Sequence, residues 1–183
     1  NVKQPLNRII ANAETIHGRL LGPIRENYAG YARDIASAAS HLKELVDDFG
    51  DLEAIERPGY EPDMERVDCC ELARRAAGLL TVRAADHNIA LQVPPESESL
   101  AAIGEYRRIL QILVNLVGNA VRYSPDGTTV RVSTTIGDDH RPAITVADEG
   151  GGIDPEDRER IFEKFERLGR TADGGSGLGL YIS

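Results

Sequence analysis

Two long apolar patterns of helical spacing occupy the first third of the chain and constrain its fold more than any other feature. Apolar side chains recur at steps of three and four residues, first over 6–20 and then over 28–55. This spacing places an apolar stripe on one face of each helix. Gly22 and Pro23 lie between the two patterns, where they favour a turn. The sequence therefore predicts an antiparallel helical hairpin.

A hairpin of this size cannot close a hydrophobic core by itself, because too little of its apolar surface is covered. The stripe of the second helix continues in near-heptad fashion, which is typical of helices that pack against partner helices. We therefore expect a homodimer in which two hairpins form a four-helix bundle.

A linker and a change of pattern follow the hairpin. The segment ERPGYEP at 56–62 holds two prolines and a glycine in seven residues, which favours a domain boundary. Beyond it the pattern predicts a mixed α/β region. Its expected elements are helices over roughly 70–85 and 105–123, and strands over 88–93, 128–136 and 142–148.

Charge and cysteine content argue against several classes of protein. The chain has 30 acidic and 21 basic residues and a formal net charge of -9, which disfavours broad binding to nucleic acid or to anionic membranes. No apolar run approaches the length of a membrane span, so membrane attachment would have to come from segments outside this sequence. Cys69 and Cys70 are adjacent and give no disulfide framework, and the cytoplasm is therefore the expected location.

Three short motifs carry residues suited to nucleotide chemistry. NLVGNAVRYS at 115–124 puts two asparagines on one helix face, and amide oxygens are ligands that Mg²⁺ accepts. ADEGGGID at 147–154 puts a carboxylate and three glycines after a strand, where backbone can approach a ligand closely. GGSGLGL at 174–180 is a glycine-rich loop of the kind that binds anions. Taken singly, each motif has an ordinary explanation as a solvated pair, a capped turn or a linker.

In this order the three motifs resemble the ATP-binding domain of sensor histidine kinases, within the GHKL superfamily that includes gyrase, the Hsp90 chaperones and the MutL proteins. IFEKFER at 161–167 is similar to the phenylalanine motif between the two glycine motifs of these kinases. The resemblance implies an α+β fold, with an α/β sandwich ATP-binding domain after the hairpin. We expect the hairpin at 1–57, a linker at 58–65, and the ATP-binding domain at 66–183, which is incomplete at its C-terminus.

The resemblance also implies a role for each motif residue. Asn119 would coordinate Mg²⁺, and Asn115 would have a catalytic role at the metal or its water. Asp148 would accept a hydrogen bond from the adenine amine. The other expected ATP contacts shape the adenine pocket, meet phosphate or anchor a lid over roughly 153–174: Gly150, Gly152, Ile153, Arg122, Tyr123, Phe162, Lys164, Phe165, Arg167, Gly175, Ser176, Gly177, Leu178 and Gly179. The charged middle of the lid is interpreted in large part as a solvated surface helix.

The first residues of the chain resemble the end of a phospho-acceptor box, which reads His, an acidic residue, two residues, Thr or Asn, Pro, Leu. Pro5 and Leu6 match its end, so the acceptor histidine is expected immediately before Asn1. The resemblance then implies ATP–Mg²⁺-dependent autophosphorylation and transfer to an aspartate of a response regulator. Two catalytic positions depart from the pattern. Asn1 replaces the carboxylate that serves as general base, and Gln4, whose amide can still orient a water, replaces Thr or Asn.

Two alternatives stay open. The departure at Asn1 favours a pseudokinase, phosphatase or scaffold of the same fold that binds ATP and a partner. An ATP-driven clamp or chaperone of the wider superfamily is a third reading. The dimerising hairpin, the phenylalanine motif and the acidic charge all disfavour that third reading.

Overall fold

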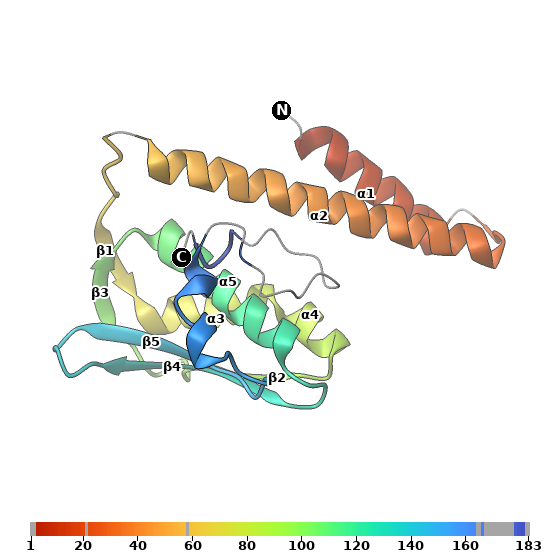
Figure 1. Cartoon of the computed structure of the whole chain (residues 1–183). Coiled ribbons are helices and arrows are strands. Elements are labelled where there is room, and N and C mark those ends of the chain that lie inside the picture. The colour runs from red at the N-terminus through yellow and green to blue at the C-terminus, as the bar shows by residue number, and fades with distance from the viewer. Residues whose placement is uncertain (1–2, 21, 58, 164–165, 167–177, 182–183) are drawn as a thin grey trace. The chain divides into compact units, whose positions relative to one another are not determined.

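The computed structural model describes residues 3–20, 22–57, 59–163, 166 and 178–181. They form two compact units, one built on the chain up to Tyr60 and one on Glu61–Glu163 with Gly179–Tyr181. Helices alone make the first unit, and helices with two sheets make the second (Figure 1). The expected α+β class is therefore confirmed.

The first unit is the expected antiparallel hairpin, made of α1 (Lys3–His17) and α2 (Glu26–Glu56). Proline is tolerated in the first turn of α1, where its missing N–H would have no partner within the helix. At the loop end, the carbonyl of Ala29 lies 3.1 Å from Nδ1 of His17, which closes the hairpin. Gly22 in the connection has a φ of 126°, a conformation that glycine adopts without strain. No helix in the described ranges is both long and apolar enough to cross a bilayer.

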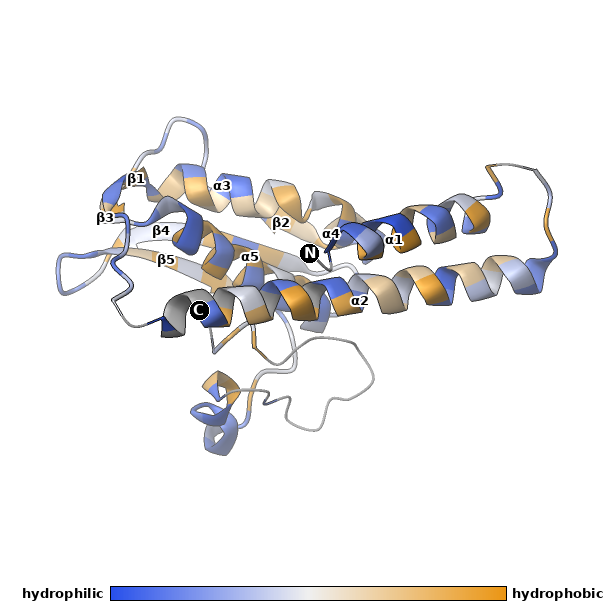
Figure 2. Cartoon of the chain, turned by 90° about the horizontal axis from the view of Figure 1, so that it is seen from above, coloured by the Kyte–Doolittle hydropathy of each residue, from blue (hydrophilic) through white to orange (hydrophobic). Residues whose placement is uncertain are grey.

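The hairpin leaves several large apolar side chains uncovered, while most of its buried residues are alanines, with Leu6 and Leu52 buried beside them. Ala13 of α1 and Ala32 of α2 are buried. Tyr31 is 60% exposed and Ile35 is 52% exposed, and apolar residues recur along the α2 ribbon in Figure 2. An open apolar groove of about 360 Å³ runs along this face, lined by Ile9, Asn12, Ala13, Ile16, Tyr28, Tyr31, Ala32 and Ile35.

The second unit packs three helices against a three-stranded sheet. The helices are α3 (Cys69–Leu79), α4 (Thr81–Asp86) and α5 (Tyr106–Tyr123). The sheet has the order β2-β4-β5, with β2 (Ala90–Gln92) parallel to β4 (Thr129–Ile136) and β4 antiparallel to β5 (Pro142–Ala147). A separate antiparallel pair joins β1 (Glu65–Asp68) to β3 (Ala101–Gly104). Two 3₁₀ turns come after β5 in the chain, η1 (Pro155–Asp157) and η2 (Arg160–Phe162).

The core of this unit lies between the helices and the sheet. Val117 and Val121 of α5 are fully buried in one cluster with Val130 and Val132 of β4. A second cluster is formed by Val67, Leu72, Ala76 and Leu113, which join β1, α3 and α5. Both clusters hold α5 by its apolar face, so the position of its polar face is fixed.

Most elements lie where the sequence predicts them, and three differences have physical causes. The expected helix over 70–85 is two helices, because Leu80 has non-helical backbone angles. β1 and β3 were not predicted, since four-residue strands give almost no alternating signal. The prediction of a surface helix in the lid is wrong over 155–162, because this segment forms the two 3₁₀ turns η1 and η2. That segment lacks an apolar stripe, and a helix without a buried face gains little from packing.

Candidate functional site

The first glycine motif packs directly on the C-terminal end of α5. The N–H of Gly150 donates a hydrogen bond of 2.8 Å to Oδ1 of Asp148, which closes a tight turn after β5. A Cβ at Gly150 would lie 2.8 Å from that oxygen and 2.9 Å from the carbonyl oxygen of Tyr123. Real Cβ atoms do not approach so closely, so a glycine is required at this position.

The side chain of Asp148 is exposed. Its Oδ1 is used in the turn, while Oδ2 has no hydrogen-bond partner within the described part of the chain. Further along the loop, Gly152 has a φ of 74°, in the left-handed region that favours glycine. Ile153 follows it and is 38% exposed. The turn thus presents one carboxylate oxygen beside a glycine backbone, an arrangement that can accept a hydrogen bond from an exocyclic amine.

The other glycine motif also contacts α5. Nδ2 of Asn115 donates a hydrogen bond of 3.1 Å to the carbonyl oxygen of Gly179. The preceding residue, Leu178, is buried. Asn115, Asn119 and Tyr123 follow one another at four-residue steps along one side of α5. Eight helical residues span about 12 Å, so Asn119 lies on this side between the contacts to the two motifs.

Asn119 suits the role of a magnesium ligand, because it carries an amide oxygen that no described residue engages. Its side chain is half-buried and makes no hydrogen bond to any described residue. An amide oxygen in that state can enter the coordination sphere of a hard cation such as Mg²⁺. One turn further, the guanidinium carbon of Arg122 lies 5.5 Å from the ring centre of Tyr123, a cation–π contact.

Ser124 is a residue of this region that sequence reasoning missed. It is buried, and its hydroxyl oxygen has no hydrogen-bond partner among the residues that the structure describes. It directly follows the Tyr123 carbonyl on which Gly150 packs. A buried hydroxyl normally binds protein, water or ligand, and no sequence pattern signals such a group, because serine after a helix is usually a solvated cap or turn residue.

The structure does not test every expected site residue. Asn1, Lys164, Phe165, Arg167, Gly175, Ser176 and Gly177 lie outside the described residues. Phe162 is described, and its ring is exposed on η2. Gln4 is exposed in the first turn of α1, where a helix start with proline was expected.

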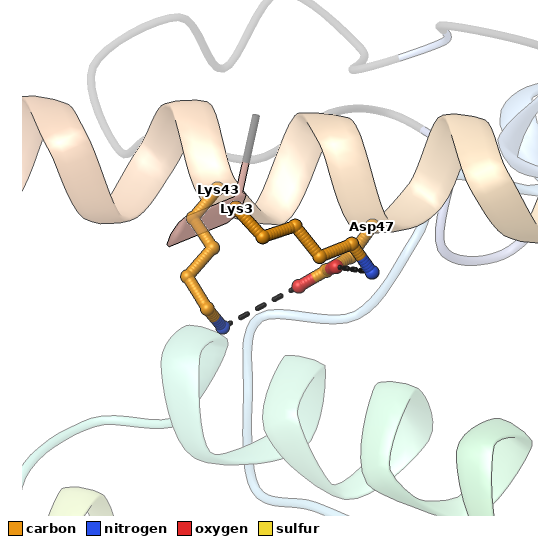
Figure 3. A network of polar contacts seen from close by, with 3 residues as sticks. All are labelled: Lys3, Lys43 and Asp47. Carbon is orange, nitrogen blue, oxygen red and sulfur yellow. Dashed lines mark hydrogen bonds and ion pairs between the residues drawn. The ribbon is translucent and has the colours of Figure 1, made fainter. Parts of the chain in front are cut away.

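The start of α1 is tied to α2 by an ion-pair network that sequence reasoning also missed (Figure 3). Asp47 of α2 pairs with Lys3 of α1, and its other oxygen lies 3.4 Å from Nζ of Lys43. Burial raises the pKa of Asp47, but the hydrogen bond and charge of Lys3, with the charge of Lys43, outweigh it and lower the pKa overall. The spacing of Lys43 and Asp47 could have predicted their pair, whereas the pair across the hairpin depends on the register of the two helices.

Comparison with known proteins defines the class of the chain. The family of histidine kinase-, DNA gyrase B- and HSP90-like ATPases matches residues 104–183. The histidine protein kinase DivJ of Caulobacter vibrioides is 35% identical over 183 residues, which is the whole of this chain and 30% of that protein. The sensor-like histidine kinase SenX3 of Mycobacterium tuberculosis is 34% identical over 163 residues, 86% of this chain and 38% of that protein. The chain contains a GHKL-type ATP-binding domain and spans about a third of these relatives.

Solved structures agree with this class. Full-length ShkA in complex with AMPPNP matches with a TM-score of 0.70 and 28% identity, covering 99% of this chain and 37% of that one. The mycobacterial sensor histidine kinase MprB matches with a TM-score of 0.54 and 30% identity, covering 64% of this chain and 74% of that one. The chain belongs to the sensor histidine kinase family and is a catalytic core of that family.

Proposed function

We propose that the protein is the kinase core of a two-component system. It binds ATP with Mg²⁺, phosphorylates a histidine that immediately precedes Asn1, and passes the phosphoryl group to an aspartate of a response-regulator receiver domain. The observation that carries the proposal is the contact of both glycine motifs with one side of α5, with Asn119 between them. DivJ and SenX3, which are named histidine kinases, support it.

The residues divide the work of binding and positioning. Asp148 accepts the adenine amine through the carboxylate oxygen that its own turn does not use. Asn119 would hold Mg²⁺, with Asn115 assisting at the metal or its water, and the bound ion would supply charge neutralisation at the phosphates. Phosphoryl transfer asks a protein mainly for positioning and for such charge neutralisation. The remaining phosphate contacts are assigned to Arg122 and to the second glycine motif.

The hairpin is the proposed dimerisation unit. Its uncovered apolar face and the groove of about 360 Å³ along it suit a second copy of the same hairpin. A two-fold dimer places the same face of both copies together and gives each large side chain an apolar partner. We place the protein in the cytoplasm, with any membrane anchor in segments outside this chain.

The nucleotide site is tested with a matched pair of glycine variants. Gly150→Ala puts a methyl group where the Tyr123 carbonyl and the Asp148 carboxylate already lie. Gly151→Ala adds the same methyl group with no atom within 4 Å. We expect the first variant to weaken ATP binding at least tenfold, about 1.4 kcal/mol, and the second to stay near wild type in titration calorimetry. Equal affinities for the two variants would contradict the proposed adenine site.

The reaction is tested with the full-length protein and labelled ATP. We expect an acid-labile phosphohistidine and transfer of the label to a receiver domain. The substitution of a carboxylate by Asn1 motivates a second candidate, a pseudokinase or phosphatase of the same fold. ATP binding without phosphohistidine, together with loss of phosphate from a phosphorylated receiver, would support that candidate. An ATPase activity stimulated by DNA or by a client protein would instead favour a clamp or chaperone.

A further inference from the structure

We propose that Asn115 is a positioning residue that fastens the end of the second glycine motif to α5 through its amide nitrogen. The bond from Nδ2 to the Gly179 carbonyl, at 3.1 Å, joins residues 64 positions apart. Both residues belong to the same compact unit. This role is separate from a metal contact, because it uses the donor half of the side chain and acts through another residue.

The chemistry of the partner fixes which half of the amide is used. A backbone carbonyl only accepts hydrogen bonds, so the group facing Gly179 has to be the NH₂ group. The carboxamide oxygen therefore points away from that carbonyl. An asparagine can serve two partners in this way, with nitrogen for the protein and oxygen for a metal or its water, whereas a carboxylate cannot make the first contact.

The consequence for the site is geometric. Asn115 stands one turn before Asn119, on the same side of α5. By holding Gly179, it sets where the second glycine motif ends relative to the proposed magnesium ligand. A Cβ added at Gly179 would lie 3.7 Å from Cγ and Nδ2 of Asn115, so the chain at Gly179 passes close to the carboxamide. The effect on ATP binding rests on the proposed function, while the contact itself does not.

The contact is tested by hydrogen exchange of the whole chain, without nucleotide or Mg²⁺. Asn115→Asp keeps the shape of the side chain and an oxygen for a metal but replaces the donor by an acceptor that opposes the Gly179 carbonyl. Asn115→Ala removes both halves. We expect exchange of the Leu180 and Tyr181 amides to rise about three- to tenfold in both variants, the range that loss of one hydrogen bond gives.

Controls separate a local effect from general destabilisation. Arg107→Ala, an exposed position on the same helix, should leave the Leu180 and Tyr181 amides as in wild type. Amides of strand β4, such as that of the buried Val130, report global unfolding. If the aspartate variant does not fold, the exchange rates of Asn115→Ala alone test the contact. Wild-type exchange at Leu180 and Tyr181 in Asn115→Ala would overturn the contact. ATP affinity of the same variants is then measured by titration calorimetry. Raised exchange with unchanged ATP affinity would overturn the role of Asn115 in the site. Neither the exchange rates nor the ATP affinity depends on kinase activity, so a failure of the proposed reaction would leave both results standing.

Discussion

The two units of this molecule differ in the size of the apolar residues that they bury. In the unit that contains the sheet, large side chains such as Leu72 and Val117 are completely buried. In the hairpin, alanines such as Ala13 and Ala32 fill the helix contact, while Tyr31 and Ile35 stay exposed. A protein normally buries its large apolar side chains in preference to small ones, since each contributes more free energy to folding when buried. The second unit therefore has closed hydrophobic clusters of its own, whereas the hairpin keeps several large apolar side chains at its surface.

The largest effect should come from the closed core. Leu72→Ala removes a fully buried side chain from the cluster that joins β1, α3 and α5. We expect the free energy of unfolding to fall by about 2–5 kcal/mol, through lost burial and the cavity that remains. Leu79→Ala on the same helix, at a position 65% exposed, is the control and should cost less than about 0.5 kcal/mol. Urea unfolding followed by circular dichroism measures both, and similar values would deny the closed core.

The open face of the hairpin gives the next largest effect, on association and not on folding. Ile35→Ala removes a half-exposed side chain that lines the apolar groove. Completing its burial in a dimer is worth about 1 kcal/mol per copy, and a two-fold dimer counts it twice. We therefore expect the dissociation constant of the dimer to rise about 30-fold. Analytical ultracentrifugation measures this, with exposed Asp34→Ala on the same helix as the control, and identical constants would contradict the proposed bundle.

A smaller effect is expected where the second unit caps a helix. The Asp68 side chain caps α3, accepting hydrogen bonds from the amides of Cys70 at 2.8 Å and Leu100 at 3.2 Å. Asp68→Ala should cost about 1 kcal/mol, whereas Asp68→Asn, which keeps an acceptor oxygen, should cost less. Differential scanning calorimetry ranks the variants, and a larger loss for asparagine than for alanine would exclude capping as the cause.

The same residue predicts a pH dependence. The hydrogen bond from the Ser99 side chain lowers the pKa of Asp68 below its ordinary 3.8, with burial opposing and the amides of Leu100, Cys70 and Glu71 adding to it. A lowered folded pKa means that the stabilisation is complete above the unfolded pKa and is lost as pH falls through the folded one. The stability difference between wild type and Asp68→Asn should therefore shrink below about pH 4.

The smallest effect is expected in the ion pairs of the hairpin. Asp47→Asn removes the charge that pairs with Lys3 and Lys43, all of which are partly exposed. Such pairs contribute less than about 1 kcal/mol and are screened by salt. We expect a small loss of hairpin stability that disappears in high salt, measured by thermal unfolding. Because the pKa of Asp47 is lowered, the contribution should also be lost at acid pH. A salt-independent loss would indicate packing instead of charge.

The sequence predicted the long helices and the β4–β5 hairpin because strong periodicity extends over many residues. It failed where the signal is local and weak, as at the break in α3–α4 at Leu80 and in the four-residue strands β1 and β3. Within the site, the order of the three motifs predicted the ATP-binding class, which the family match to residues 104–183 supports. The sequence could not predict which atoms form hydrogen bonds with each other, because bonds such as Asn115–Gly179 join residues 64 positions apart.

By itself the sequence determined which faces of the helices are apolar and which polar residues could meet a nucleotide. It did so because side-chain type and spacing are written along the chain. Only the tertiary structure decided that the carbonyl of Tyr123 meets Gly150, and that of Gly179 meets Asn115. A backbone carbonyl is chemically the same at every residue, so no residue pattern encodes which one will be used. That choice is made by the path of the chain, once the buried faces have fixed α5 against the sheet.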